Sequence, residues 1–355
     1  MNSNHSRGKS GGSSWPARMD FPAGEFLGKP RNTGWFTLDH GRRSTLEHVR
    51  LGVLDVGSNT VHLVAVDAVS GGHPTPMSDW KQSLRLVELL DKKGAIEDKG
   101  VKKLTETVQD AADLAKNLKC EEFLAFATSA VRSATNADEV LKHIEKETGV
   151  KLDVLSGKDE ARLTFLAVRR WYGWSAGRIT NLDIGGGSLE LSTGSDEEPD
   201  IAVSLDLGAG RLTHEWFDSD PPSKKTVNTL RDYIDAELGT VSDQFLAQGE
   251  AGLAVGTSKT FRTLARLTGA APSSAGPYVK RTLTAPGLRQ LIAFITRMTA
   301  ADRAELEGVS PDRSHQIVAG ALVAEAAMRA LKIDKLEICP WALREGVILR
   351  QIDKG

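Results

Sequence analysis

Apolar positions along the chain follow two patterns, short unbroken runs and longer stretches in which apolar residues recur every three or four positions. The runs predict buried strands at 51–56 (LGVLDV), 61–66 (VHLVAV), 83–89 (SLRLVEL), 123–127 (FLAFA), 150–155 (VKLDVL), 201–205, 253–255 and 335–339. The helical spacing predicts helices over 98–118, from 136 (with Asn136 and Glu139 as a capping box), from 157, over 223–245, 286–299 and 316–331, and from 342. Strands followed by helices predict an α/β fold.

The stretch LDIGGGSLEL, residues 182–191, reads as a strand, a glycine turn and a second strand. Because side chains alternate along a strand, Ser188 and Glu190 are expected on one face. Three bare glycines let backbone N–H groups surround an anion. The carboxylates of Asp183 and Glu190 then become useful if Mg²⁺ lies between them and phosphate oxygens. A plain glycine hairpin with a solvated glutamate is the alternative interpretation.

An upstream stretch repeats this pattern. Residues 51–59, LGVLDVGSN, again place an aspartate, a glycine and a small hydroxyl residue between two apolar runs. Asp55 and Asp183 therefore occupy matching positions, which favours a duplicated unit. The sequence predicts two phosphate-facing hairpins on either side of one cleft.

Composition narrows the class of protein. A length of 355 residues allows two domains with sizeable cores, and a formal net charge of −2 gives no global attraction to nucleic acid or membrane. Cys120 and Cys339 lie far apart and are expected to be buried thiols. No apolar run is long enough to span a bilayer, so a cytoplasmic protein is expected. Residues 1–48, rich in Gly, Ser, Pro and Arg, are expected to be disordered and dispensable for activity.

The motifs LDVGSNTVHL, ATSAVR, SGKDEAR, LDIGGGSLEL, GTSKT and LREG occur in this order between Arg50 and Gly355. With them the chain resembles the exopolyphosphatase and guanosine-pentaphosphate phosphatase (Ppx/GppA) family, and above all its short actinobacterial members. The resemblance implies two ribonuclease-H-like domains, as in actin, sugar kinases and chaperone ATPases, flanking a cleft. These would be residues 49–165 and 166–341, with the last helix, about 342–355, packing back on the first domain.

The resemblance also assigns site residues. Glu160 takes the position of the catalytic glutamate that activates water, with Asp159 as its rival and a simple helix N-terminal acid as the alternative. Asp55, Asp183 and Glu190 would hold Mg²⁺ (or Mn²⁺). The phosphate-binding residues would be Ser58, Asn59, Arg132, Gly185, Gly186, Gly187, Ser188, Gly256, Thr257, Ser258 and Lys259.

GTSKT departs from the family pattern, since many members carry a second glycine where Lys259 stands. The long cationic side chain disfavours a nucleotide and favours polyphosphate. No His-Asp pair follows Gly256, as an HD-type hydrolase domain would need, so short chains are the expected substrate.

The leading interpretation is thus an Mg²⁺-dependent exopolyphosphatase, expected to be a homodimer that binds neither nucleic acid nor membrane. Guanosine polyphosphates, the signals of the stringent response, are expected as inhibitors or substrates. Hydrolysis of guanosine pentaphosphate and a non-catalytic sensor of polyphosphate or guanosine polyphosphate are the alternatives.

Overall fold

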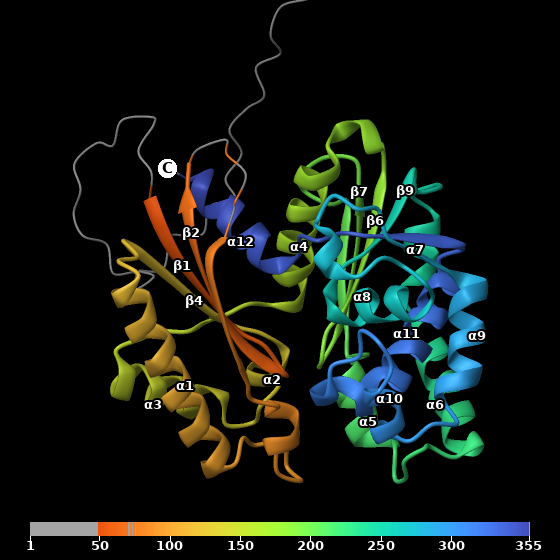
Figure 1. Cartoon of the computed structure of the whole chain (residues 1–355), viewed down its shortest axis with the longest axis horizontal. Coiled ribbons are helices and arrows are strands. Elements are labelled where there is room, and N and C mark those ends of the chain that lie inside the picture. The colour runs from red at the N-terminus through yellow and green to blue at the C-terminus, as the bar shows by residue number, and fades with distance from the viewer. Residues whose placement is uncertain (1–48, 70–71, 73, 75, 355) are drawn as a thin grey trace, which may run out of the picture. The chain divides into compact units, whose positions relative to one another are not determined.

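The apolar run after residue 48 forms β1, the central strand of a five-stranded sheet (Figure 1). The computed structural model describes residues 49–69, 72, 74 and 76–354, so the predictions for residues 1–48 lie outside the described residues. The strand order is β3-β2-β1-β4-β5. The strands are β1 (Val49–Val56), β2 (Thr60–Ala68), β3 (Pro76–Ser83), β4 (Glu122–Ala127) and β5 (Asp153–Val154). β2 runs antiparallel to both β1 and β3, whereas β4 runs parallel to β1 and β5.

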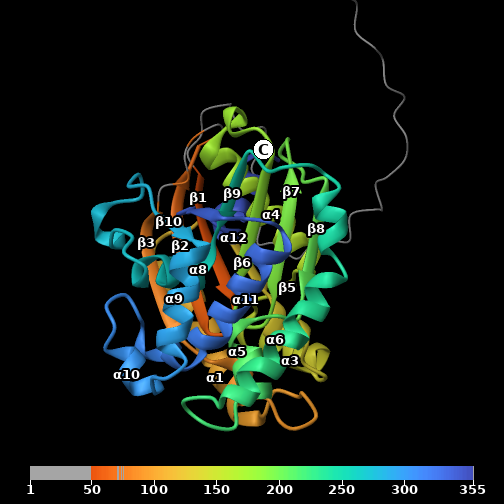
Figure 2. The same ribbon diagram turned by 90° about the vertical axis from the view of Figure 1, so that its right-hand side faces the viewer.

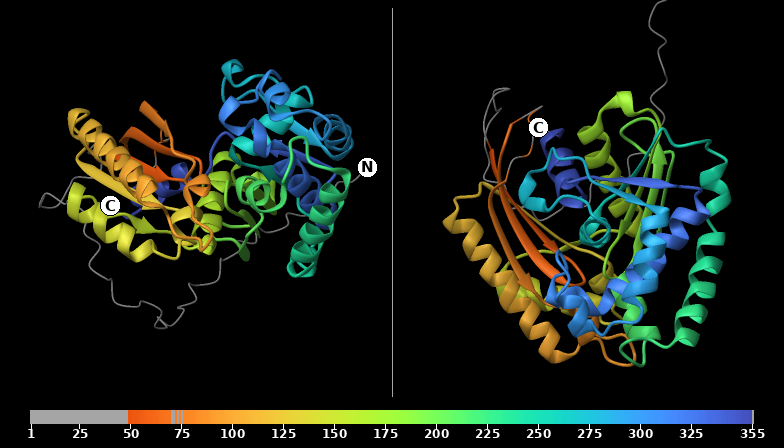
Figure 3. Two further views of the ribbon diagram at one scale, coloured as in Figure 1. Left: turned by 90° about the horizontal axis from the view of Figure 1, so that it is seen from below. Right: turned by 45° about the vertical axis from the view of Figure 1, so that its right-hand side comes forward.

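Helices cover both faces of this first sheet. On one face, α1 (Asp98–Asn117) buries Leu104, Val108 and Ala111, spaced at helical intervals, against the sheet and α3 (Ala137–Thr148). Figure 3 shows α1 and α3 beside the orange strands. On the other face, Ile348 of α12 (Leu343–Ile352) packs among the buried residues of β1, β2 and β4 that point away from α1. The predicted strands 51–56, 61–66 and 123–127 are confirmed, as is the first long helix.

A second sheet repeats the first. Its order is β10-β11-β9-β6-β7-β8, formed by β6 (Ile179–Ile184), β7 (Leu189–Gly194), β8 (Ile201–Leu205), β9 (Leu253–Gly256), β10 (Thr282–Thr284) and β11 (Lys335–Ile338). β8-β7-β6 are antiparallel, and β6-β9-β11 are parallel. The order β8-β7-β6-β9-β11 therefore corresponds to β3-β2-β1-β4-β5 of the first sheet, and β10 is an additional edge strand. The predicted duplication is therefore present in the backbone.

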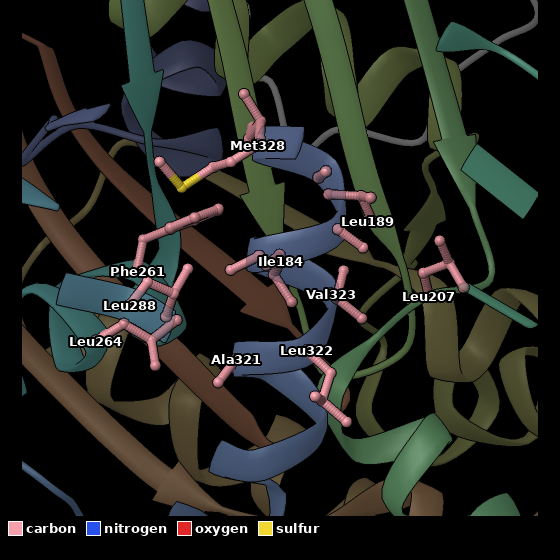
Figure 4. Packing of buried hydrophobic residues seen from close by; sticks show 14 of the residues in the cluster. Ile184, Leu189, Leu207, Phe261, Leu264, Leu288, Ala321, Leu322, Val323 and Met328 are labelled. Atoms are coloured by element: carbon pink, nitrogen blue, oxygen red, sulfur yellow. The ribbon is translucent and has the colours of Figure 1, made fainter. Parts of the chain in front are cut away.

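A group of helices packs on one face of the second sheet and forms a hydrophobic core with it (Figure 2). The helix α11 (Ile317–Ala330) contributes the largest share of this core. Figure 4 shows Leu322 and Val323 of α11 meeting Ile184 and Leu189 of the sheet. α11 is apolar on nearly all sides and is accordingly buried almost throughout. The other helices of this half are α5 (Ala209–Trp216), α6 (Lys224–Gly239), α7 (Ser242–Leu246), α8 (Ser258–Leu267), α9 (Ala285–Ile295) and α10 (Ala300–Ala304).

Two helices cover the opposite face of the second sheet and join it to the first. Phe165 of α4 (Gly157–Tyr172) and Leu349 of α12 pack with residues of β6 and β9. The two helices cross closely at Gly346, where a Cβ would lie 1.9 Å from the Leu163 carbonyl oxygen. The glycine of the LREG motif thus permits this crossing. The predicted boundary between residues 165 and 166 lies within α4, and the domain limits stay a prediction.

The structure also corrects local predictions. The run 83–89 is not a strand, because Arg85 takes a left-handed conformation and a 3₁₀ turn, Leu86–Leu89, follows. Asn136 does not form a capping box, since its side chain bonds the backbone of Ile96 instead. The helix predicted over 223–245 breaks between α6 and α7. VKLDVL pairs only over β5.

The two cysteines are free thiols, Cys339 buried as predicted and Cys120 only half-buried. In the part of the chain that the structure describes, no helix has the length and apolar character needed to cross a bilayer.

Candidate active site

The two predicted hairpin turns meet each other. A Cβ on Gly186 would lie 2.4 Å from Asn59 Nδ2 and 2.8 Å from Ser58 Cβ, and a Cβ on Gly187 would lie 2.5 Å from Ser129 Oγ. Ser58 and Ser129, which come from the β1–β2 turn and the end of β4, share a buried hydrogen bond of 2.9 Å between their hydroxyls. A side chain at position 186 or 187 would force these neighbours to shift, because the turn of the second sheet presses against the first.

The first residues of α5 hold the glycine turn through hydrogen bonds to its carbonyl groups. The carbonyl oxygens of Gly185 and Gly186 accept backbone N–H groups of Ala209 and Arg211, at 3.0 and 2.9 Å. The Gly187 carbonyl accepts the Arg211 Nε–H at 3.0 Å. Among the described residues, the N–H groups of Gly186 and Gly187 donate to no backbone carbonyl. These two donors are the kind of group that binds an anion.

Four carboxyl groups influence one another's pKa at this place, Glu160 and Glu190 buried and Asp55 and Asp183 partly exposed. Burial is the main cause that raises the pKa of Asp55, to about 6, and the charge of Asp183 raises it further. Burial likewise raises the pKa of Asp183 and of Glu190, and Glu160 and Asp183 both add to the shift of Glu190. Anions so placed repel one another, so a cation among them would stabilise all of them.

Glu160 lies in the first turn of α4, only 7% exposed. Burial raises its pKa to about 7, while the guanidinium of Arg132 opposes this shift through an ion pair with Glu160 Oε1. Arg132 is fixed by a second hydrogen bond, from Nη1 to the Leu155 carbonyl at 2.8 Å. Asp159, the rival carboxylate, is exposed, and it accepts the hydroxyl of Ser156, the residue that caps α4, at 2.5 Å.

Glu190 is opposite Asp183 in the β6–β7 ladder and is held by Ser204 of β8, whose hydroxyl donates to Oε1 at 2.8 Å. Ser204 in turn approaches α4 at Gly157, where a Cβ would lie 2.3 Å from Ser204 Cβ. The glycine of SGKDEAR therefore allows the second sheet to bring Glu190 near the start of the helix that carries Glu160.

In the GTSKT loop, Thr257 supports Asp183. Thr257 donates its hydroxyl to Asp183 Oδ2 at 2.7 Å, and the carbonyl of Gly256 accepts the Cys339 N–H at 3.1 Å. Ser258 adopts a left-handed conformation, with φ 67°. Lys259 is an exposed residue of α8, and partial desolvation together with the neighbouring Arg313 and Arg262 lowers its pKa.

Several residues of the site carried no sequence-based assignment. Arg344, in the LREG motif, lies with Nη1 3.5 Å from Asp55 Oδ2. Ser129 stands in ATSAVR and could have been found from that motif. Ser204 and Arg211 carry no signal in the sequence, since their roles depend on which strands and turns meet.

The donor set suits Mg²⁺ in chemistry. All candidate ligands are carboxylate oxygens, and this ion usually takes only one or two protein carboxylates and completes its shell with water and substrate phosphates. Within residues 49–69, 72, 74 and 76–354, no three His, Cys, Asp or Glu side chains form a ready metal cage.

Two matched α/β sheets whose acidic turns meet at one site form the two-domain fold that the sequence predicts. The chain belongs to the Ppx/GppA phosphatase family, whose model matches residues 65–355. It is 68% identical over 305 residues to exopolyphosphatase 1 of Mycobacterium tuberculosis, covering 86% of this chain and 89% of that protein. It is 66% identical to the Mycobacterium leprae exopolyphosphatase 1, with 86% and 90% covered.

Solved structures share the fold. An exopolyphosphatase from Cytophaga hutchinsonii aligns with a TM-score of 0.78 at 24% identity, covering 86% of this chain and 98% of that one. The Aquifex aeolicus family member aligns with a TM-score of 0.72 at 23% identity, covering 87% and 99%. These likenesses confirm the predicted fold class.

Proposed function

We propose that this protein is an exopolyphosphatase, which removes orthophosphate from the ends of inorganic polyphosphate and acts on short chains. The names of its mycobacterial relatives support the reaction class. The observation that carries the proposal is the position of Glu160, a buried carboxyl with a raised pKa, beside the place where the two turns meet.

Glu160 is the proposed general base. A water aligned with the terminal phosphorus forms the new P–O bond and gives its proton to Glu160, while the bridging P–O bond breaks and the shortened chain leaves. The raised pKa of Glu160 supports this role, because a base works best when its pKa is near the working pH. Asp159 is less suited, since its carboxylate is exposed and accepts the hydroxyl of the helix cap Ser156.

The N–H groups of Gly186 and Gly187, which donate to no backbone carbonyl of a described residue, are the proposed donors to the terminal phosphoryl oxygens. Arg132 reaches the same place and pairs with Glu160 in the free protein. We propose that Arg132 contacts the incoming phosphate, with which its planar guanidinium can form two parallel hydrogen bonds.

Asp55, Asp183 and Glu190 are the proposed ligands of Mg²⁺ or Mn²⁺, directly or through water. When bound, the ion supplies positive charge that lets carboxylates and phosphates share one site. Arg344 forms an ion pair with Asp55. Thr257 donates a hydrogen bond to Asp183, so each carboxylate is held in one orientation.

The experiment compares phosphate release from triphosphate, long-chain polyphosphate and guanosine pentaphosphate, each with and without Mg²⁺. We expect Mg²⁺-dependent release from polyphosphate, and faster turnover of short chains. Preferred hydrolysis of guanosine pentaphosphate would instead assign the protein to the nucleotide branch of the family. Binding without release from any substrate would point to a sensor.

A further inference from the structure

A pocket of about 450 Å³ opens beside the candidate active site. Its walls come from one side of α8, from the segment 271–281 and from Ile338–Pro340, which precedes α12. Four basic residues line it, namely Lys259, Arg262, Arg266 and Arg281.

Two of these four cations are already engaged. Arg281 donates to the carbonyls of Ala271, Pro272, Gly276 and Val279, so it shapes the wall of the pocket. Arg266 forms an ion pair with Glu307, an acidic residue that also lines the pocket.

The other two cations, Arg262 and Lys259, form no ion pair with a described residue. Arg262 donates from Nη2 to the Pro340 carbonyl at 3.1 Å, and its buried Nε has no hydrogen-bond partner within the described residues. Lys259 forms no ion pair with any described residue, and it lies close enough to Arg262 for the two charges to oppose each other. The charges of Glu345 and Asp183 favour the charged form of Arg262. An anion bound between Arg262 and Lys259 would reduce the repulsion between the two cations.

The pocket is connected to the active site through shared residues. Arg262 and Asp183 act on each other electrostatically. The wall residue Cys339 bonds the backbone of Gly256, and the next residue, Thr257, holds Asp183. An extended anion whose end lies at Asp183 would therefore meet Arg262 as it leaves the site.

We infer that this pocket binds the phosphates of the substrate chain that lie beyond those in the active site, with Arg262 as their main contact. The inference rests on the proposed function, since it assigns the pocket to the tail of the same polyphosphate. Because the pocket is finite, affinity should rise with chain length only until the chain fills it. The pocket would thus set the chain length at which the enzyme works best.

The test measures KM for triphosphate and for chains several phosphates longer, in the wild type, Arg262→Gln and Ser274→Glu. Ser274 lines the pocket from an exposed position, so its substitution adds a negative charge without removing a core contact. Arg289→Gln removes an exposed charge from α9, outside the pocket, and is the matched control.

We expect the ratio of the KM for longer chains to that for triphosphate to rise roughly tenfold or more in Arg262→Gln, the effect of losing one charge-assisted hydrogen bond. Ser274→Glu should move the ratio in the same direction, and Arg289→Gln should not. A ratio unchanged in both pocket variants would overturn the inference.

Calorimetric binding of the same chains without divalent cations separates this inference from the proposed function. If the wild type hydrolyses no polyphosphate but binds longer chains through Arg262, the function is wrong and the pocket assignment holds. If the wild type binds a second, separate triphosphate that Arg262→Gln loses while the KM ratio stays constant, the pocket serves a free anion and the inference fails.

Discussion

Gly187→Ala should separate the two turns that form the candidate site. The added methyl group would lie 2.5 Å from Ser129 Oγ and 3.0 Å from Ser129 Cβ, where ordinary contact begins at 3.4 Å. Ser129 cannot simply rotate away, because its hydroxyl shares the 2.9 Å hydrogen bond with Ser58. The overlap must therefore be relieved by a shift of the turn or by loss of that bond.

Such overpacking typically costs about 1–3 kcal/mol of folding free energy. For a domain of this size each kcal/mol lowers the Tm by about 2–4 °C. A displacement of about 1 Å between catalytic groups costs about 10²-fold in rate. We thus expect a folded protein with a Tm several degrees lower and a kcat for phosphate release reduced about 100-fold.

Differential scanning calorimetry and a phosphate-release assay measure these two quantities. Gly239→Ala, at the end of α6, is the matched control, since a Cβ there meets nothing within 4 Å. It should keep the kcat of the wild type and should not lower the Tm, because alanine is favoured over glycine in a helix. If Gly187→Ala also keeps both, the turns do not meet as described and the basis of the site is wrong.

Three other predictions concern the metal, the base and the core. A chelator should abolish phosphate release, and added Mg²⁺ should restore it. Asp183→Ala should lose this response to Mg²⁺. An Asp183→Ala enzyme that Mg²⁺ still activates would count against Asp183 as a metal ligand. Since Glu160 accepts a proton only when ionised and its pKa is about 7, kcat/KM should fall about tenfold per unit below pH 7. Because Arg132 lowers that pKa, Arg132→Ala should move the acid limb to higher pH, and an unmoved limb would assign it to another group. Arg169 is fully buried and donates to the carbonyls of Gly173, Gly177, Gly194 and Asp196. Arg169→Leu should therefore lower the free energy of unfolding by about 3–5 kcal/mol, measured by urea titration, and a change below about 1 kcal/mol would show that these bonds contribute little.

Much of the fold was predictable because its two halves repeat one pattern. The runs around Asp55 and Asp183 gave the central hairpins, since an apolar run that ends at an aspartate and a glycine is readable from sequence alone. The helix of residues 98–117 was equally clear from its period. Glu160 needed the resemblance, because one acidic residue in a first helical turn is common.

The rest depended on contacts between segments far apart in the chain. Leu84 and Leu86 are apolar like strand residues, but their backbone N–H groups bond the carbonyls of Asn59 and Ser58, which turns the chain out of the sheet. Asn136 is a good helix cap by type, yet the backbone of Ile96 takes its side chain. Ser204 became part of the site only because β8 packs beside α4 at Gly157.

The central claim is that Glu160 activates water at the meeting point of the two turns. The most direct measurement is the kcat for phosphate release and the polyphosphate affinity of Glu160→Gln, with Asp159→Asn as the matched control. The account predicts a kcat lower by about 10²–10⁴-fold in Glu160→Gln, with polyphosphate still bound and Asp159→Asn close to the wild type. A Glu160→Gln enzyme with wild-type kcat, or a loss as large in Asp159→Asn, would contradict it.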